Sequence, residues 1–344
     1  MALVTTPAQI RWGLAEEIAA GTAVLTMTKI IYAENDPPIS SGDSLISYRG
    51  KSVNRYRASE QFKRGHYSPS ISGLTMPWNA HQTPNFLYSL FQGVTRSTNK
   101  LTFNSDSADF SSILSGATIT SSFPHVMTIT REDATTGAWG HVLEGAVVSS
   151  MTISGDTSSA ITCSVDLVGL DADYNATVVP AAEAFSTFGK IHTLVELDGT
   201  SPAYIDFFAG APPVESFSIT ISNGAHVKAY NSAAPRQIDF ADFIDVSGSI
   251  TIASDRSGNT IPAFEGYMAA MVAGTEGAFV IASGELDPAD THWSIAVNAR
   301  ISEGIDEDEG DAHNATINFV GVQNGATEDI QIVTNSNTSG TDAW

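Results

Sequence analysis

Two adjacent segments decide the fold, and they read Gly145-Ala-Val-Val-Ser-Ser-Met-Thr-Ile-Ser-Gly155 and Ala160-Ile-Thr-Cys-Ser-Val-Asp-Leu-Val-Gly169. In both segments apolar residues alternate with Ser, Thr or Asp, which is the pattern of a half-buried antiparallel strand. The same alternation occurs at Val24–Ile31, Val126–Thr130, Val147–Ile153, Ile161–Val168, Phe217–Ile221, Ile250–Ile252, Ile295–Val297 and Ile317–Val320. Clusters of Gly, Asn, Asp and Ser separate these stretches, as turns require. The sequence therefore predicts a mainly β protein.

Two internal segments have helical character instead. In Thr83–Gly93, Pro84 suits the first turn of a helix capped by Thr83, and Gly93 suits its end. Ile261–Gly274 again has a Pro near its start and a Gly at its end. Its predicted buried stripe consists of Phe264, Met268, Met271 and Val272.

The surroundings of the two predicted helices reveal an internal repeat. The matching segments are, pair by pair, Leu25–Ile31 with Phe217–Ile221, Ser59–Phe62 with Pro235–Ile238, Ser70–Met76 with Val246–Ile252, Val126–Ile129 with Trp293–Ala296, and Leu167–Gly169 with Phe319–Gly321. Each half has the order strand, strand, strand, helix, strands. The ordered series predicts a duplicated α+β module.

The repeat and the composition together predict the domain limits. We expect an N-terminal arm over 1–23, a first domain over 24–170 with a long loop at 34–53, a linker over 171–212, a second domain over 213–322 and a polar, mobile C-terminal tail over 323–344. The linker is expected to hold a hairpin at Ile191–Leu197 with a turn at Asp198-Gly199.

The net charge of −22 is unevenly spread over the 344 residues. Residues 1–131 hold eleven Lys and Arg against eight Asp and Glu, about +3, and residues 132–344 hold five against thirty, about −25. This balance argues against tight wrapping of nucleic acid, which needs basic residues to displace counterions. Six basic residues are concentrated in one stretch: Arg49, Lys51, Arg55, Arg57, Lys63 and Arg64. Two interpretations stay open, a solvated strand edge that resists aggregation and a contact with an acidic surface on another copy.

Candidate chemistry is sparse. Gly42-Asp-Ser-Leu45 has the letters of an esterase motif, but no buried strand precedes it and no His follows an Asp by three positions. The carboxylate run Glu303–His313 does not have the spacing of a Ca²⁺ loop, which favours a solvated loop. No phosphate-binding or dinucleotide motif is present. The sequence therefore predicts no enzyme, no metal and no cofactor.

Cys163 is the single cysteine, and it alternates as a strand residue does. We interpret it as a buried small apolar residue in a reducing compartment. The N-terminal residues have no basic stretch followed by an apolar core, and no apolar run has the length of a membrane span. We therefore expect assembly in the cytoplasm.

The two opening segments, together with Val214–Gly224 and Val246–Ile252, resemble the tail tube proteins of long-tailed, non-contractile bacteriophages. The resemblance covers about Leu25 to Gly321 in the family's order. It implies two tandem β-sandwich or half-barrel domains, each with one flanking helix. It also implies rings of six such domains, stacked into a tube that conducts DNA without specific binding. Implied partners are other copies of the chain, a tape-measure protein and tail terminator and tip proteins, within a virion assembled in the host cytoplasm.

The duplication adds a stoichiometry to this resemblance. If each half fills one of six positions, three chains close a ring. We further expect the loop 34–53 and the basic stretch Arg49–Arg64 to lie at the contact between stacked rings, and an acidic channel lining to repel DNA phosphates. The alternative is a non-enzymatic adhesin or carbohydrate-binding module. The Trp residues (Trp12, Trp78, Trp139, Trp293 and Trp344) are dispersed, which disfavours a sugar-stacking surface.

Overall fold

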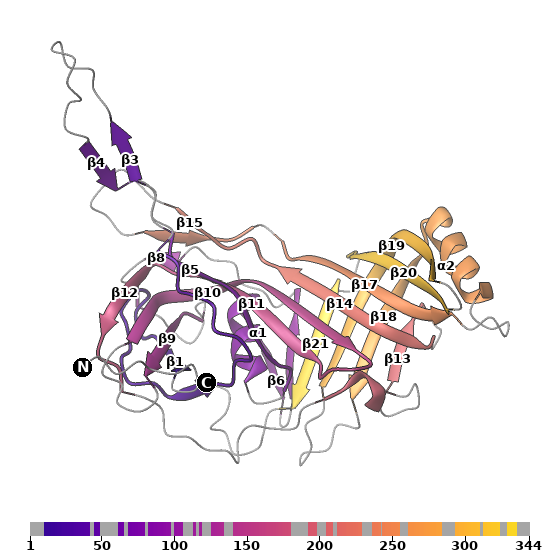
Figure 1. Ribbon diagram of the computed structural model, residues 1–344, viewed down its shortest axis with the longest axis horizontal. Coiled ribbons are helices and arrows are strands. Elements are labelled where there is room, and N and C mark those ends of the chain that lie inside the picture. The colour runs from indigo at the N-terminus through magenta and orange to yellow at the C-terminus, as the bar shows by residue number, and fades with distance from the viewer. Residues whose placement is uncertain are drawn as a thin grey trace, which may run out of the picture.

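The computed structural model confirms a mainly β fold, with most described residues in strands of antiparallel sheets and two α-helices (Figure 1). It describes residues 10–41, 45–48, 61–64, 68–79, 82–97, 100–105, 113–114, 117–118, 125–133, 140–179, 192–197, 204–208, 212–228, 236–241, 243–254, 261–283, 293–309, 312–323 and 329–335. The first-half strands are β1 (Ile10–Glu16), β2 (Lys29–Ile31), β3 (Leu45–Tyr48), β4 (Gln61–Arg64), β5 (Ser70–Pro77), β6 (Thr95–Ser97), β7 (Lys100–Asn104), β8 (Ile113–Leu114), β9 (Met127–Asp133), β10 (Gly140–Asp156), β11 (Thr162–Val168) and β12 (Asp171–Ala176).

The later strands are β13 (Tyr204–Phe207), β14 (Val214–Ser222), β15 (His226–Lys228), β16 (Gln237–Asp239), β17 (Asp245–Ser254), β18 (Glu276–Ser283), β19 (Trp293–Glu309), β20 (Ala312–Gly321) and β21 (Ile330–Asn335). The helices are α1 (Thr83–Phe91) and α2 (Ile261–Ala273). Sixteen strands form one sheet, with the central order β2-β1-β9-β10-β14-β17-β20-β19-β21-β7-β6. The two halves of the chain are therefore joined by continuous strand pairing.

The long strand β10 joins two parts of this sheet. Its first residues lie between β9 and β12, and its last residues lie between β11 and β14. The strand changes neighbours near Gly145, which has a left-handed φ of 63° and where an added Cβ would lie 2.7 Å from a Leu170 side-chain carbon. Glycine is needed there because only it accepts both the backbone angle and the close approach.

The strand neighbours of the second half repeat those of the first. The pairs β1–β9, β9–β10, β10–β11, β11–β5 and β10–β12 correspond to β13–β18, β18–β19, β19–β20, β20–β17 and β19–β21. The helices α1 and α2 occupy corresponding places in the chain, after β5 and after β17. Both halves therefore have the same order of antiparallel neighbours.

The register corrects two of the segment pairs expected from the sequence. Met127 lies opposite Ala146 in β10, as Gly277 lies opposite Ala299 in β19, so β9 corresponds to β18 and not to Trp293–Ala296. The place that β14 takes beside β17 is taken beside β5 by residues 34–40, and not by Leu25–Ile31. Short alternating segments resemble one another, and only pairing separates them.

One large core serves both halves. Its cluster runs from Trp12 to Ile332, and the Trp78 and Trp293 rings meet edge to face across it with centroids 5.5 Å apart. Both indoles are buried. The halves thus share a core as well as a sheet.

The chain ends differ from the expected arm and tail. Ile10–Glu16, inside the expected arm, forms β1 between β2 and β9, with Leu14 buried. Ile330–Asn335, inside the expected mobile tail, forms β21 between β19 and β7, with Ile330 and Ile332 buried. The expectation of a tail was wrong for this segment, because Ile330 and Ile332 are buried in the core that both halves share.

The segment expected to be a linker contributes to both halves. Asp171–Ala176 forms β12 beside β10, and Tyr204–Phe207 forms β13 beside β18. Leu194–Glu196 is a 3-10 helix, so the expected hairpin over Ile191–Leu197 was wrong. Its expected turn at Asp198-Gly199 lies outside the described residues.

The two helices are confirmed, with corrections at their ends. The N-cap of α1 is Gln82, and Thr83 lies in the first turn, where its Oγ1 accepts a hydrogen bond from the Asn79 N–H at 3.1 Å. Gln92, not Gly93, takes the left-handed conformation after α1, whereas Gly274 does so after α2 as expected. Val272 does not belong to a buried stripe, since 84 % of it is exposed.

Candidate assembly interface

One face of the shared sheet carries hydroxyl side chains. In its central strands, buried apolar residues alternate with partly exposed polar ones. Neighbouring strands bring hydroxyls together: Thr152 Oγ1 lies 3.0 Å from Thr220 Oγ1, and Thr251 Oγ1 lies 3.2 Å from Thr316 Oγ1. We call this surface the hydroxyl face, and it comprises Ser150, Thr152, Ser154, Thr162, Ser164, Ser216, Ser218, Thr220, Ser247, Ser249, Thr251, Thr316 and Asn318.

The charges near the hydroxyl face are acidic. Asp166 lies on it and accepts hydrogen bonds from the Ser72 and Ser150 hydroxyls at 3.0 and 2.8 Å. Glu303 lies opposite Asn318, at the edge of the same face. None of the residues that define the hydroxyl face is Lys or Arg, and Arg300, opposite Val320 at the end of the ladder, is paired with Glu276. Sequence reasoning missed the face as a unit, although the alternating Ser and Thr of each strand were its signal.

The junction between the halves is the β10–β14 ladder. Ser150 to Asp156 pair with Ser222 to Ser216 without interruption. Beyond the ladder the buried Asn223 donates through Nδ2 to the Leu90 carbonyl at 2.8 Å and to the Val148 carbonyl at 2.9 Å. Asn223 therefore ties β14 to the last turn of α1 and to β10, a role that no sequence pattern indicated.

The corresponding edge of β19 has a different environment. Residues 303–309 of β19 pair with β20 on one side, and among the described strands none pairs with their other side. This is the position at which β10 receives β14. The described part of the sheet therefore ends here in an unpaired strand edge, and such edges are usually protected or paired in proteins.

A second edge lies in the first half, along residues 34–39. The Glu34 N–H donates to the Thr75 carbonyl at 2.8 Å, and the Asn35 side chain bonds to Gly73 and Thr75, so this segment is held against β5. Asp36 forms an ion pair with Arg131. No described strand pairs with the other side of residues 34–39.

The acidic run Glu303–His313 is not the loop that we expected. Glu303 to Glu309 lie in β19 and Ala312 and His313 lie in β20, with Asp308 opposite His313. The ladder with β20 continues without a register shift from the pair Glu303–Asn318 to the pair Glu309–Ala312, through the carboxylate-rich stretch. The run forms a strand because its backbone groups pair with those of β20. If the run were a solvated loop, β20 would lose its hydrogen-bond partners on this side.

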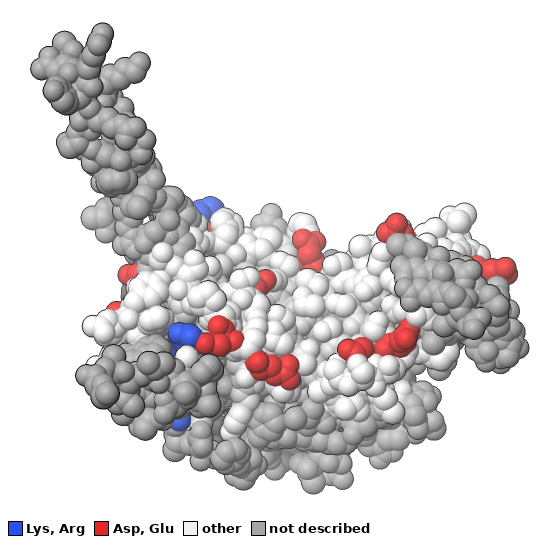
Figure 2. All heavy atoms as spheres, in the orientation of Figure 1, with Lys and Arg blue, Asp and Glu red and all other residues white. Residues whose placement is uncertain are grey.

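The basic stretch lies at a projecting hairpin. Lys63 and Arg64 are residues of β4, which pairs with β3 in a two-stranded sheet of its own. The β3–β4 hairpin points away from the body of the molecule (Figure 1). Arg49, Lys51, Arg55 and Arg57 lie outside the described residues. Figure 2 shows how few Lys and Arg side chains appear on the described surface in this view, where Asp and Glu are dispersed.

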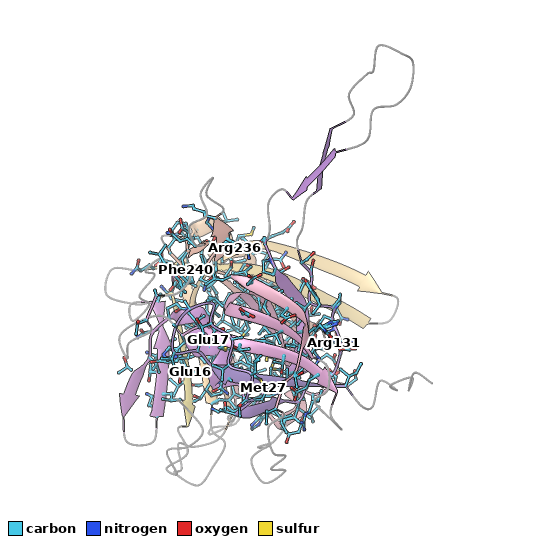
Figure 3. The ribbon with its side chains drawn as sticks, turned by 90° about the vertical axis from the view of Figure 1, so that its left-hand side faces the viewer. Glu16, Glu17, Met27, Arg131, Arg236 and Phe240 are labelled. Carbon is cyan, nitrogen blue, oxygen red and sulfur yellow. The ribbon has the colours of Figure 1, made fainter. Side chains whose placement is uncertain are left out.

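Two buried carboxylates connect segments of the first half through hydrogen bonds and an ion pair. Glu17 accepts hydrogen bonds from the Gly145 N–H at 2.7 Å, the Thr128 hydroxyl at 2.8 Å and the Gly21 N–H at 2.7 Å. Burial raises the pKa of Glu17 to about 7, against the opposing effect of these donors. Glu132 is paired with Arg11 at 2.9 Å, and burial raises its pKa although Arg11 opposes the shift. Figure 3 shows Glu17 among the strands of this half. Both carboxylates have structural partners within the first half.

The described residues contain no cluster suited to metal binding. No group of three or more His, Cys, Asp and Glu side chains in this part of the chain could hold a metal ion. Cys163 is buried, and burial raises the pKa of its thiol to about 12. Residues 42–44 of the esterase-like motif lie outside the described residues. Neither described helix has the length and apolar composition of a membrane-spanning helix.

The Trp residues that the structure describes do not form a surface for sugar stacking. Trp12, Trp78 and Trp293 are buried in the shared core. Trp139 and Trp344 lie outside the described residues. Carbohydrate-binding modules present exposed aromatic rings, so this arrangement disfavours that alternative.

The fold and these surfaces define a structural β protein whose main unpaired features are strand edges and a projecting hairpin. Residues 7–328 match the family model described as phage tail tube protein, which covers nearly the whole chain. The chain therefore belongs to the phage tail tube protein family, and it is a structural component of a virion tail tube. No curated protein matches the chain.

Proposed function

We propose that this chain polymerises as stacked rings into a phage tail tube, with three chains per ring and each half filling one of six equivalent positions. The observation that carries the proposal is the matched set of strand pairs in the two halves. A duplicated module explains why both halves have the same neighbours in the same orientation. Closed rings remove the strand edges that the single chain leaves exposed.

The β10–β14 junction supplies the model for contacts between chains. Applying the same relation to the second half places residues 34–40 of the next chain beside residues 303–309 of β19. Three such contacts and three internal junctions would close the ring. Pro37 and Pro38 lack a backbone N–H, so the contact between chains would contain fewer ladder hydrogen bonds than the internal one.

The hydroxyl face is the proposed wall of the channel, because the opposite face of the sheet is occupied by the core. Its hydroxyl groups are uncharged, and Asp166 and Glu303 add negative charge. Hydroxyl groups can donate hydrogen bonds to phosphate but carry no positive charge, and tight DNA binding requires Lys or Arg to neutralise phosphates. Such a wall would let DNA pass during ejection without specific binding, and the acidic β19 edges would add repulsion.

Contacts along the tube are proposed for the basic stretch. Arg49, Lys51, Arg55, Arg57, Lys63 and Arg64 would meet the acidic surface of a stacked ring, as opposite charges favour association. Charge reversal at Arg55 and Arg57 should then slow tube elongation, whereas unchanged polymerisation would remove this idea. A tape-measure protein inside the tube and terminator and tip proteins at its ends are the further proposed partners, with assembly in the host cytoplasm.

Cryo-electron microscopy of tubes grown from concentrated protein tests the proposal. We expect rings of three chains with six similar lobes around an open channel. Rings of six whole chains would overturn the trimer, and protein that stays monomeric at every concentration would overturn the function.

Proline substitution tests the β19 edge within the same assay. Adjacent strand residues direct their N–H groups to opposite sides, so Asp306→Pro and Glu307→Pro should differ, with one blocking assembly and the other weakening the β19–β20 ladder. The matched controls Asp306→Asn and Glu307→Gln keep the backbone N–H and should still assemble. If both proline variants form normal rings, the β19 edge is not the contact between chains.

A further inference from the structure

The β3–β4 hairpin and the β15–β16 hairpin occupy corresponding places in the two halves. β15 and β16 lie between β14 and β17, and β3 and β4 lie between residues 34–40 and β5. Both are antiparallel pairs of short strands. Gln237 and Ile238 in β16 have the counterparts Gln61 and Phe62 in β4. The two hairpins are thus equivalent in topology.

The β15–β16 hairpin packs on the first half of its own chain. Ile238 and Val227 are buried with Ile113, Val147 and Leu170 in a separate apolar cluster. β16 also pairs with β8, with Ile238 opposite Ile113.

Arg236, at the start of β16, fixes this hairpin from its flank. It donates to the Leu170 carbonyl at 2.6 Å and lies 3.1 Å from an Asp171 carboxylate oxygen. Figure 3 shows Arg236 and Phe240 together on this side of the first half. The β15–β16 hairpin of the second half therefore packs against the first half, beside the β10–β14 junction.

The β3–β4 hairpin has no such support from its own chain. Its described residues form a two-stranded sheet that joins no other strand, and it projects from the body (Figure 1). A short isolated hairpin is marginally stable in water. Its equivalent is stabilised by burial against a neighbouring half, so β3–β4 calls for a comparable surface.

The second half offers the corresponding surface, and no described hairpin covers it. Val320 lies opposite Arg300 in the ladder, as Val168 lies opposite Val147. The Val322 N–H donates to the Asn298 carbonyl at 2.8 Å, and the Leu170 N–H donates to the Glu144 carbonyl at 2.8 Å.

These matched bonds assign Val320 and Val322 to the places of Val168 and Leu170. In the first half Leu170 is 2 % exposed and Val168 packs on the same cluster as the β15–β16 hairpin, whereas in the second half Val320 is 39 % exposed and Val322 is partly exposed. The second half thus exposes apolar residues at the place where the first half is covered.

We propose that the β3–β4 hairpin of one chain docks on the second half of the neighbouring chain in the same ring, over Val320 and Val322, as β15–β16 docks on the first half within the chain. Residues 42–67, which contain the hairpin, hold six Lys and Arg against two Asp and Glu, a balance of +4. Residues 213–322 hold four against sixteen, a balance of −12. The occupant is therefore matched in charge as well as in topology. The inference rests on the proposed ring. It assigns Lys63 and Arg64 of β4 to a contact within the ring, so the contact between stacked rings would rest on Arg49, Lys51, Arg55 and Arg57.

Paired cysteines test the contact. We expect the variant Phe62→Cys with Val320→Cys, oxidised after assembly, to give covalent dimers and trimers and nothing larger on a non-reducing gel. Phe62→Cys with Val195→Cys is the matched control, because Val195 is 67 % exposed but lies on the 3-10 helix Leu194–Glu196. This control should stay uncrosslinked. The native Cys163 is buried and does not interfere.

Each other outcome overturns a defined part of the argument. Rings seen by negative-stain microscopy without the Phe62–Val320 link overturn this inference alone. Links that extend beyond three chains place the hairpin between rings and also overturn it. An internal link in dilute monomer means that the hairpin folds back on its own chain. Absence of rings for the unmodified chain overturns the proposed function as well.

Charge reversal gives an independent readout. Lys63→Glu with Arg64→Glu should raise the protein concentration needed for ring formation about tenfold or more, because like charges then meet across the contact. Phe62→Ala should weaken assembly but leave the unfolding midpoint of the dilute monomer unchanged. Ile238→Ala at the equivalent position should lower that midpoint. An equal loss of monomer stability for Phe62→Ala and Ile238→Ala would contradict the proposed docking.

Discussion

Glu17→Gln should remove a specific part of the pH dependence of folding. The Glu17 carboxylate is buried beside the bend of β10 and holds Gly145, Thr128 and Gly21 through three hydrogen bonds. Burial raises its pKa from 4.5 to about 7. The amide of glutamine has a similar shape but does not titrate, so the variant separates protonation from packing.

The sign and size of the effect follow from this shift. In the unfolded chain Glu17 loses its proton near its ordinary pKa, whereas the folded chain keeps the proton until about pH 7. The folded state binds more protons between these values, so its stability falls as pH rises. The whole contribution is about 3 kcal/mol, of which about 2 kcal/mol is lost between about pH 5.5 and pH 8.5.

Urea unfolding of dilute monomer at constant ionic strength measures this contribution. The stability of Glu17→Gln relative to the unmodified chain should increase by about 2 kcal/mol from about pH 5.5 to pH 8.5. Glu265→Gln, at an exposed position on α2, subtracts the general effect of removing one negative charge. A stability difference that stays constant over this pH range would refute the reasoning, because Glu17 would then be ionised in the folded chain throughout.

Four other substitutions and one labelling experiment test the packing. Asn223→Ala should cost about 3 kcal/mol in urea unfolding, because two buried carbonyls lose their donor. Arg11→Met should cost about 3 kcal/mol or more by leaving buried Glu132 unpaired, and adding Glu132→Met should restore most of the loss; no recovery would mean that the pair is not the cause. Ile238→Ala should cost about 2–5 kcal/mol in the same assay. Cys163 should react with a thiol reagent only at the rate of unfolding, and rapid labelling of native protein would contradict its burial.

The strand content followed from local patterns. Ile161–Val168 and Phe217–Ile221 alternate clearly, and both lie within strands whose alternate residues are buried. The helices were equally accessible, because Pro and Gly mark their ends. The terminal strands were harder to predict from the sequence. Ile330–Asn335 is short and lies within a polar stretch, and its burial depends on pairing with β19 and β7.

The candidate interface could be predicted only in outline. The basic residues of Arg49–Arg64 are evident in the sequence, but the projection of β3–β4 is a property of the folded chain. Asn223 resembles any turn residue until Leu90 and Val148 are brought beside it. The acidic run Glu303–His313 resembled a loop because charge suggests solvent, yet its backbone is paired with β20. Side-chain polarity does not report on backbone pairing.

The sequence by itself determined the mainly β class, the family resemblance and the uneven charge. It did so because alternation fixes which side of each strand is buried, and because charge is a property of composition. Only the tertiary structure decided which strands are neighbours, that both halves share one sheet, and that no described strand pairs with the edge of β19 at the place where β10 pairs with β14. Strand pairing depends on backbone hydrogen bonds and burial between residues far apart in the chain. Similar strands can satisfy those demands in several arrangements, and the shared core selects one.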